Sequence, residues 1–190
     1  MSNLQQKDEL YVLGEMLDRD KKAVAVVGSR LITPRGRRLT TLFTEALVEA
    51  GYTIVSGLAR GVDSVAHTTA LEKKGRTIAV LGSGIDVIYP PENKALAERI
   101  TKNGALVSPF PKGTPPRPEN FLARNKIVVM LSVAVLVVEG KRRSGTLSTA
   151  SHAANEGVEV YAIPGSEATD WLINQGVNSV ATPEKLVESL

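Results

Sequence analysis

Short apolar runs alternate with amphipathic segments along most of the chain. The run Ala23 to Gly28 is apolar, rich in valine and ends in glycine, which is typical of a buried parallel strand. After Pro34, apolar residues recur at helical spacing as far as Ala50, and Gly51 is suited to cap the end of that helix. The same unit then repeats. We predict further strands at 52–55, 77–81, 105–108, 134–138 and 159–163, further helices at 62–74, 93–102, 119–131 and 147–155, and two short helices around Trp171 and Leu186.

The beginning of the chain departs from this alternation. Leu10, Leu13 and Leu17 fall on one face of a helix, so we predict an N-terminal helical segment over 1–22. A single domain is then expected over 23–190. Within it, residues 109–118 are rich in proline and predict a stiff connector.

Strands that are apolar on both faces and alternate with helices indicate a mainly parallel sheet covered on both sides. Right-handed crossovers make such a sheet doubly wound, so the expected fold class is α/β, an extended Rossmann-like fold. Ligands of these sheets bind outside the carboxyl ends of the strands. The loops that follow the predicted strands are therefore the segments to inspect.

Four of these loops combine glycine with serine or threonine, and three of them also contain arginine. Glycine lets backbone N–H groups approach an anion, hydroxyl groups donate hydrogen bonds, and arginine adds a charge-assisted contact. Glycine and serine also follow strands simply because the chain must turn, so one loop alone would not distinguish the two readings. The recurrence favours an extended phosphate-binding surface. Its expected residues are Gly28, Ser29, Arg30, Ser56, Gly57, Arg60, Gly61, Gly82, Ser83, Gly84, Ser144, Gly145 and Thr146.

Composition changes this picture only slightly. The net charge of +3 is compatible with nucleic-acid binding without requiring it. The absence of cysteine excludes thiol catalysis and disulfides, and fits a reducing, cytoplasmic location. No apolar run reaches the length of roughly 18 residues that a membrane span needs, so no membrane association is expected.

Cofactor and catalytic signatures are missing. The loop after Gly28 lacks G-x-G-x-x-G, Gly82-Ser83-Gly84 lacks the third glycine, and no Walker A motif is present. His67 and His152 both fall inside helical patterns, which favours packing or surface roles. Ser56, Asp63 and His67 have the residue types of a triad, but nothing makes Ser56 a nucleophile elbow. We therefore expect no catalytic residue, metal or cofactor.

Single-strand binders combine a basic groove with aromatic side chains on which bases stack. Aromatic residues are scarce here, yet Tyr89, Phe110 and Phe121 lie in or beside connecting segments. Phe121 is closely followed by Arg124, Asn125 and Lys126. A core position for Phe121 is an equally good interpretation.

Several of these segments resemble motifs of the DprA/Smf DNA-processing family. Gly28-Ser29-Arg30 resembles its Gly-Ser-Arg motif, and Phe121 to Lys126 resembles its FPxRNR segment. The remaining matches are residues 56–67 to SGLARGID…AH, residues 79–93 to AVLGCGLD…YPPEN, residues 144–147 to SGSL and residues 163–166 to VPGS. Together they cover roughly residues 23–180.

The resemblance implies a protein that binds single-stranded DNA, protects it and loads the RecA recombinase in natural transformation or recombination, without catalysing a reaction. It implies that Arg30 contacts a DNA phosphate, with Arg60, Phe121, Arg124 and Lys126 near the same pocket. A homodimer and RecA are the protein partners it implies.

The chain also departs from the family pattern. The family's SAM-like and winged-helix-like domains do not fit in this sequence, and the polar loop after Ser166 is shortened. Lys126 replaces the second arginine of RNR, which keeps the charge but weakens bidentate contact.

Two other functions are weighed against DNA binding. The first is a lysine-decarboxylase-like nucleotide phosphoribohydrolase, but the double glycine of that motif is missing and Thr149 stands where its glutamate would be. The second is a nucleotide-binding sensor or adaptor that uses the same loops.

Overall fold

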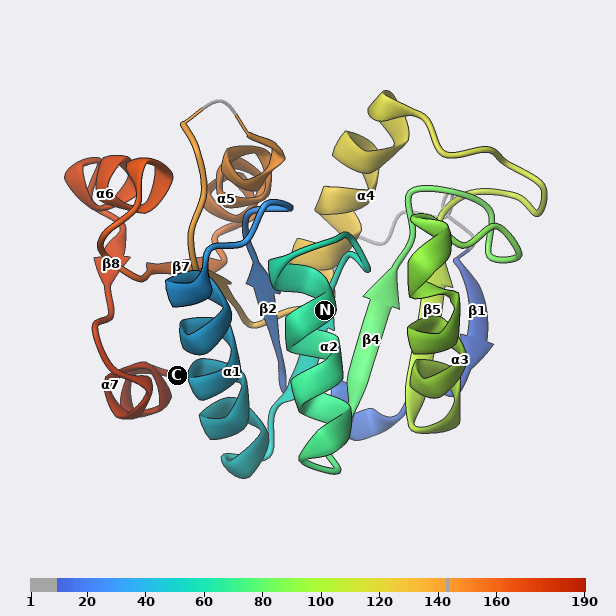
Figure 1. Ribbon diagram of the computed structural model, residues 1–190, viewed down its shortest axis with the longest axis horizontal. Coiled ribbons are helices and arrows are strands. Elements are labelled where there is room, and N and C mark those ends of the chain that lie inside the picture. Colours follow the sequence, from blue (N-terminus) through green and yellow to red (C-terminus); the bar gives the residue numbers. More distant parts are fainter. Residues whose placement is uncertain (1–9, 143) are drawn as a thin grey trace.

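Eight strands form one sheet in the computed structural model, which describes residues 10–142 and 144–190 (Figure 1). Their order across the sheet is β1-β5-β4-β3-β2-β6-β7-β8, and every neighbouring pair is parallel except β1 with β5. The strands are β1 (Tyr11–Gly14), β2 (Ala23–Val27), β3 (Thr53–Ser56), β4 (Thr77–Val80), β5 (Gly104–Ser108), β6 (Ala134–Val137), β7 (Glu159–Ala162) and β8 (Asn178–Ser179). The predicted doubly wound, mainly parallel α/β fold is confirmed.

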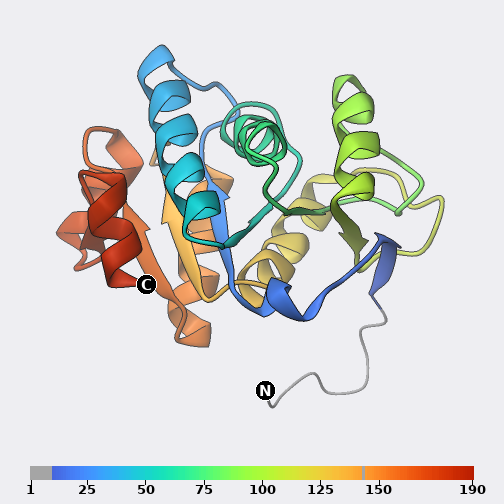
Figure 2. The same ribbon diagram turned by 90° about the horizontal axis from the view of Figure 1, so that it is seen from below.

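Helices cover both faces of the sheet (Figure 2). One face carries α1 (Pro34–Glu49), α2 (Val62–Glu72), α3 (Lys94–Lys102) and α7 (Pro183–Ser189), and the other carries α4 (Pro118–Met130), α5 (Gly145–Glu156) and α6 (Glu167–Asn174). Two short 3-10 turns, η1 (Asp18–Lys21) and η2 (Pro91–Asn93), complete the elements. None of these helices is long and apolar enough to cross a membrane.

The central strands are buried because their side chains alternate between two apolar layers. In β2, Val24 and Val26 pack with α1 and α2, while Ala25 and Val27 face the layer formed with α4 and α5. All five residues of β2 are buried. A strand covered on both faces must be apolar at successive positions, which explains why these strands could be recognised from the sequence.

The predicted N-terminal helix is wrong for residues 11–22, and residues 1–9 lie outside the described part of the chain. Tyr11–Gly14 forms the antiparallel edge strand β1 instead, and Asp18–Lys21 forms a single 3-10 turn. Leu10 and Tyr11 pack against different hydrophobic clusters, as successive residues of a strand do. Gly14 has a φ of +99° and approaches the Gly104 carbonyl so closely that a side chain would not fit, which fixes a glycine at the end of β1.

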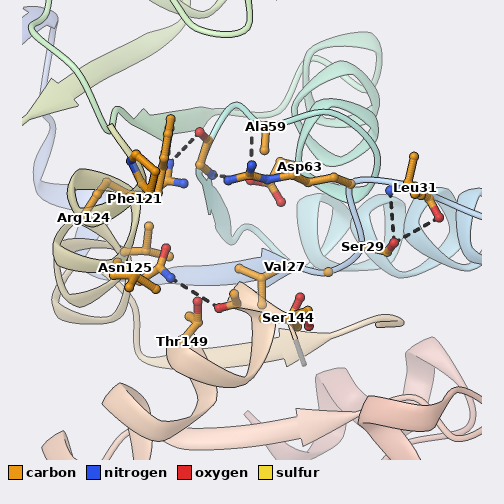
Figure 3. Close-up of a pocket in the computed structure, with 18 of the residues that line it drawn as sticks. Val27, Ser29, Leu31, Ala59, Asp63, Phe121, Arg124, Asn125, Ser144 and Thr149 are labelled. Carbon is orange, nitrogen blue, oxygen red and sulfur yellow. Dashed lines mark hydrogen bonds between the residues drawn. The ribbon is translucent and has the colours of Figure 1, made fainter. Parts of the chain in front are cut away.

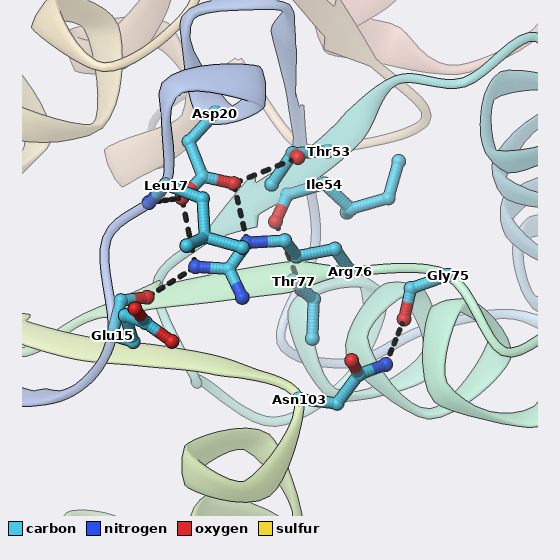
Figure 4. A network of polar contacts seen from close by, with 9 residues as sticks. All are labelled: Glu15, Leu17, Asp20, Thr53, Ile54, Gly75, Arg76, Thr77 and Asn103. Atoms are coloured by element: carbon cyan, nitrogen blue, oxygen red, sulfur yellow. Dashed lines mark hydrogen bonds and ion pairs between the residues drawn. The ribbon is translucent and has the colours of Figure 1, made fainter.

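A buried ion pair ties this segment to the centre of the sheet (Figure 4). Asp20 accepts hydrogen bonds from Arg76 Nε at 2.6 Å and Arg76 Nη2 at 2.8 Å, and each residue is only 6% exposed. Leu17 N–H and the Thr53 hydroxyl also donate to Asp20. Burial alone would raise the pKa of Asp20, but the hydrogen bonds from Arg76, Leu17 and Thr53 outweigh it and lower the pKa. The segment 15–22 is thus anchored by a charged contact that it shares with β3 and β4.

The strand order reverses direction at β2. From β2 the chain passes to β3 on one side, whereas β6 pairs with β2 on the other. In sheets of this kind a crevice opens between the loops that leave two such strands. A ligand site is therefore expected at the carboxyl ends of β2 and β6.

Candidate functional site

A pocket of about 680 Å³ lies at this reversal point (Figure 3). The loops after β2, β3 and β6 form part of its wall, and helices α4 and α5 form another part. Tyr89 from the loop after β4 and Pro116 from the connector before α4 also line it. One side contains Arg30, Gly57, Phe121 and Arg124. The other contains the beginning of α5 together with Asn125.

Phe121 is surrounded by cations and a second aromatic ring. The Arg30 guanidinium lies 5.1 Å from the Phe121 ring centroid, and the Tyr89 ring lies 5.6 Å away at an interplanar angle of 44°. Arg30 and Tyr89 are exposed, and Phe121 is partly exposed. This cluster offers a positive charge beside aromatic faces. The interpretation of Phe121 as a core residue is therefore only partly right, because its ring is partly exposed beside these groups.

Arg124 is only 4% exposed, and its guanidinium group forms hydrogen bonds within the protein. Its Nη1 donates to the Gly57 carbonyl at 2.5 Å and also to the Val80 carbonyl. Gly57 makes this possible, because a Cβ there would fall on the guanidinium group. Burial lowers the pKa of Arg124 to about 10, although the nearby Asp63 acts in the opposite direction. Arg124 therefore joins the ends of β3 and β4 beneath the Phe121 ring.

Asp63 is the charge partner below this part of the pocket. It accepts hydrogen bonds from Gly57 N–H at 3.1 Å and Ala59 N–H at 3.3 Å, from the first turn of α2. Burial raises the pKa of Asp63, and Arg124 and the two N–H groups oppose that rise. The carboxylate thus holds the loop after β3 in shape.

The N-terminus of α1 is occupied by a carboxylate of the chain itself. Glu139, which follows β6, accepts from Thr33 N–H at 2.7 Å and from the Thr33 hydroxyl at 2.6 Å. Its carboxyl group lies where a side chain at Gly36 would have to be. Glu139 therefore already fills the beginning of α1, where the helix end would otherwise favour an anion.

The beginning of α5 forms the opposite wall. Ser144 is its N-cap residue but makes no side-chain capping bond, and the Asn125 amide reaches the Gly145 carbonyl at 3.4 Å. Thr146 and Thr149 are buried and line the pocket, and the exposed Lys141 stands at its rim. Figure 3 shows Ser144 and Thr149 on the side of the pocket away from Phe121.

The structure brings ten of the predicted site residues together in the pocket lining. They are Gly28, Ser29, Arg30, Gly57, Phe121, Arg124, Asn125, Ser144, Gly145 and Thr146. The Ser29 hydroxyl is already engaged, because it accepts from Leu31 N–H at 3.1 Å. The lining therefore contains the predicted loops after β2, β3 and β6, whereas the loop after β4 contributes Tyr89 and none of the predicted residues Gly82, Ser83 and Gly84.

The other predicted residues lie outside the lining. Ser56 and Ser83 are buried and donate to the carbonyls of Val26 and Val87. Gly61 abuts the Ser29 carbonyl, Gly82 abuts the Phe121 ring, and Gly84 abuts the Pro111 carbonyl. Each of these residues supports a loop rather than presenting a polar group to the pocket.

Two predicted cations also point elsewhere. Arg60 pairs with Glu92 beside a small hollow that adjoins the pocket near Arg30 and Tyr89. Lys126 lies 4.0 Å from Glu156 of α5 and is absent from the pocket lining. Both ion pairs are largely exposed, so water weakens them strongly.

Sequence reasoning missed two apolar residues of the rim. Leu31 is 82% exposed and Leu122 is 51% exposed, and both line the pocket. Their position directly after Arg30 and Phe121 was the available signal. Arg143, in the loop after β6, lies outside the described residues.

These features define a Rossmann-like α/β domain whose pocket, at the reversal point of the sheet, combines arginine, aromatic rings and a helix N-terminus that no described side chain caps. The sequence model of the family DNA recombination-mediator protein A matches residues 4–190, and the chain belongs to that family. The resemblance to DprA/Smf proteins is thereby confirmed.

Individual relatives agree with this assignment. Protein Smf of Escherichia coli is 47% identical over 188 residues, which cover 95% of this chain and 50% of that protein. The crystal structure of DNA processing protein A from Streptococcus pneumoniae superposes with a TM-score of 0.89 at 39% identity, covering 94% of this chain and 65% of that one. The chain spans about half the length of curated relatives such as Smf.

A second solved relative is the DNA processing protein A from Helicobacter pylori, described by its unique single-stranded DNA binding mode. It has a TM-score of 0.88 and 28% identity, and the match covers 100% of this chain and 93% of that one. The fold of this chain is therefore shared over nearly its whole length.

Proposed function

We propose that this chain binds single-stranded DNA in the pocket between β2 and β6, as a DNA-processing protein that protects the strand without catalysing a reaction. The observation that carries the proposal is the exposed Arg30 beside the Phe121 and Tyr89 rings. A phosphate can pair with the guanidinium while a neighbouring base stacks on an aromatic face. The Helicobacter pylori relative, named for its single-stranded DNA binding, supports the same function here.

The proposed contacts differ in kind. Arg30 supplies charge to phosphates, Phe121 and Tyr89 supply stacking faces, and Asn125 supplies an amide. Arg124 acts as a positioning residue, because it is buried and its Nη1 already donates to the carbonyls of Gly57 and Val80. Its charge still adds to the positive potential beneath the pocket.

The hydrolase alternative has less support. Among the described residues, Asp63 is the one carboxylate that lines the pocket, and two backbone N–H groups hold it in place. Thr149 occupies the α5 position where the hydrolase motif has its glutamate. Base release from nucleoside monophosphates, followed by chromatography, tests this alternative directly.

Replacing Arg30 with alanine is expected to weaken binding of a fluorescent oligo-dT by about 10- to 100-fold, because a charged hydrogen bond is worth roughly 1.5 to 3 kcal/mol. Anisotropy titrations across a salt series provide the measurement, with the matching duplex in parallel. The slope of the logarithm of the binding constant against the logarithm of the salt concentration should decrease in magnitude by about one, as expected for the loss of one phosphate contact. Arg99→Ala, an exposed arginine on α3, is the matched control. Equal affinity of the wild-type protein for duplex and single strand, or an Arg30→Ala protein that binds normally, would rule the proposal out.

RecA loading and a homodimer belong to the same proposal, because the family resemblance implies both. Filament formation by RecA on protein-coated single strands, with and without this chain, tests the first. Sedimentation at several concentrations tests the second.

A further inference from the structure

Helix α5 differs from the other helices that begin at the pocket. A carboxylate of the chain serves the beginning of α1, namely Glu139, and another lies in the first turn of α2, namely Asp63. The first turn of α5 contains no acidic residue and has no side-chain cap. Because the first N–H groups of a helix lack partners within it and carry partial positive charge, this end of α5 can still receive an anion.

Polar side chains around the same point also lack partners. Ser144 Oγ is a buried atom with no hydrogen bond in the described part of the chain. Thr149 is 3% exposed and Thr146 is 7% exposed, both line the pocket, and neither hydroxyl takes part in a hydrogen bond between described residues. Buried hydroxyl groups are normally satisfied, so the unpartnered Ser144 Oγ, beside two pocket-lining threonines without hydrogen bonds to described residues, indicates a place for a polar ligand.

The position of these groups favours the end of a molecule over the middle of a strand. The lining beside them includes the buried apolar residues Val27 and Val128, which offer no polar contact to a continuing strand. A phosphodiester has chain on both sides and two unbridged oxygens, whereas a phosphate monoester has one attachment and three free oxygens. Three hydroxyls and the free N–H groups of α5, with Lys141 at the rim, match the monoester better.

We propose that the α5 side of the pocket is a subsite for a phosphate monoester. The proposal rests on the proposed function, because it gives the strand bound at Arg30 a preferred end. The monoester has two sources, the phosphorylated end of a DNA strand and a free nucleoside monophosphate.

Competition against a labelled oligo-dT tests the subsite with the full chain. The competitors are the same oligonucleotide with a 5′-phosphate, with a 3′-phosphate or with hydroxyl groups at both ends, together with a closed single-stranded circle, dTMP and thymidine. We expect one phosphorylated end to improve competition by about 10-fold, the effect of about one added hydrogen bond to a charged group. A matching advantage of dTMP over thymidine identifies the free nucleotide as a further source, and its absence assigns the subsite to DNA ends.

Two variants separate the subsite from general binding. Thr149→Val removes a hydroxyl at nearly constant shape, and Lys141→Ala removes an exposed charge that folding does not need. In both variants, the ratio of the affinities for the phosphorylated and the unphosphorylated oligonucleotide should be close to one. Binding of the closed circle should change much less. Thr69→Val is the matched control, because Thr69 is a buried helical threonine of α2 outside the pocket lining.

The outcomes distinguish the two proposals. The subsite is overturned if the wild-type protein binds the phosphorylated and the unphosphorylated oligonucleotide equally well, or if both variants keep the wild-type preference. Single-strand binding is left intact in either case. If neither the closed circle nor the unphosphorylated oligonucleotide binds, but dTMP still competes better than thymidine, the proposed function is overturned and the subsite remains.

Discussion

Replacing Arg76 with methionine should lower the free energy of unfolding by about 3 to 5 kcal/mol, which is typical when one partner of a buried ion pair is removed. Arg76 makes two hydrogen bonds to Asp20 and a third to the Glu15 carbonyl. Methionine fills a similar volume, so the main effect is a buried carboxylate left without its cation. Urea unfolding followed by circular dichroism measures the loss.

Two further proteins make this experiment specific. The double variant Asp20→Leu with Arg76→Met should regain much of the lost stability, because no charge then remains buried. Asp18→Asn breaks the exposed pair with Lys21 and should leave stability nearly unchanged. An Arg76→Met protein as stable as the wild type would show that Asp20 needs no cation.

Acidification should destabilise the protein through His67. Its side chain is fully buried, and burial, with a smaller contribution from Arg124, lowers its pKa from 6.5 to about 3. Below pH 6.5 the unfolded chain therefore takes up a proton that the folded protein refuses until about pH 3. Stability is fully present above pH 6.5 and falls with decreasing pH by up to about 1.4 kcal/mol per unit, on the order of 5 kcal/mol in all.

His67→Asn isolates this effect from the carboxylates, which also titrate in acid. The Thr77 hydroxyl donates to the Ile54 carbonyl, so His67 Nδ1 donates to Thr77 over 2.7 Å, and an asparagine amide can replace that donor. The free energy of unfolding should fall between pH 7 and pH 4.5 in both proteins. This fall should be about 2.5 kcal/mol smaller in the variant than in the wild type. Parallel pH profiles for the two proteins would contradict the assignment.

The central strands could be predicted because a strand buried on both faces is apolar at nearly every position. β1 could not, because Leu10, Leu13 and Leu17 happen to have helical spacing while three of the four residues of the edge strand are exposed. Exposed Val12 and Leu13 show that this segment does not follow a simple buried pattern. β8 has two residues, too few for any periodicity to appear.

The loops of the candidate site could be predicted from glycine, hydroxyl and arginine residues after strands. What could not be predicted is which polar groups remain free, since their partners lie far away in the chain. Arg124 bonds to Gly57, Glu139 bonds to Thr33, and Arg60 pairs with Glu92. Only the folded arrangement shows that Arg30 stays available while Arg124 does not.

The pairing of β1 with β5 sets the smallest fragment that can retain this fold. A fragment that begins at Ala23, the domain boundary expected from the sequence, would lose β1 and Asp20 together. It would expose the backbone edge of β5, and unpaired sheet edges promote aggregation. It would also leave Arg76 buried without its carboxylate partner. We expect such a fragment to accumulate in inclusion bodies on expression, whereas one that begins at Leu10 keeps both contacts and remains in the supernatant.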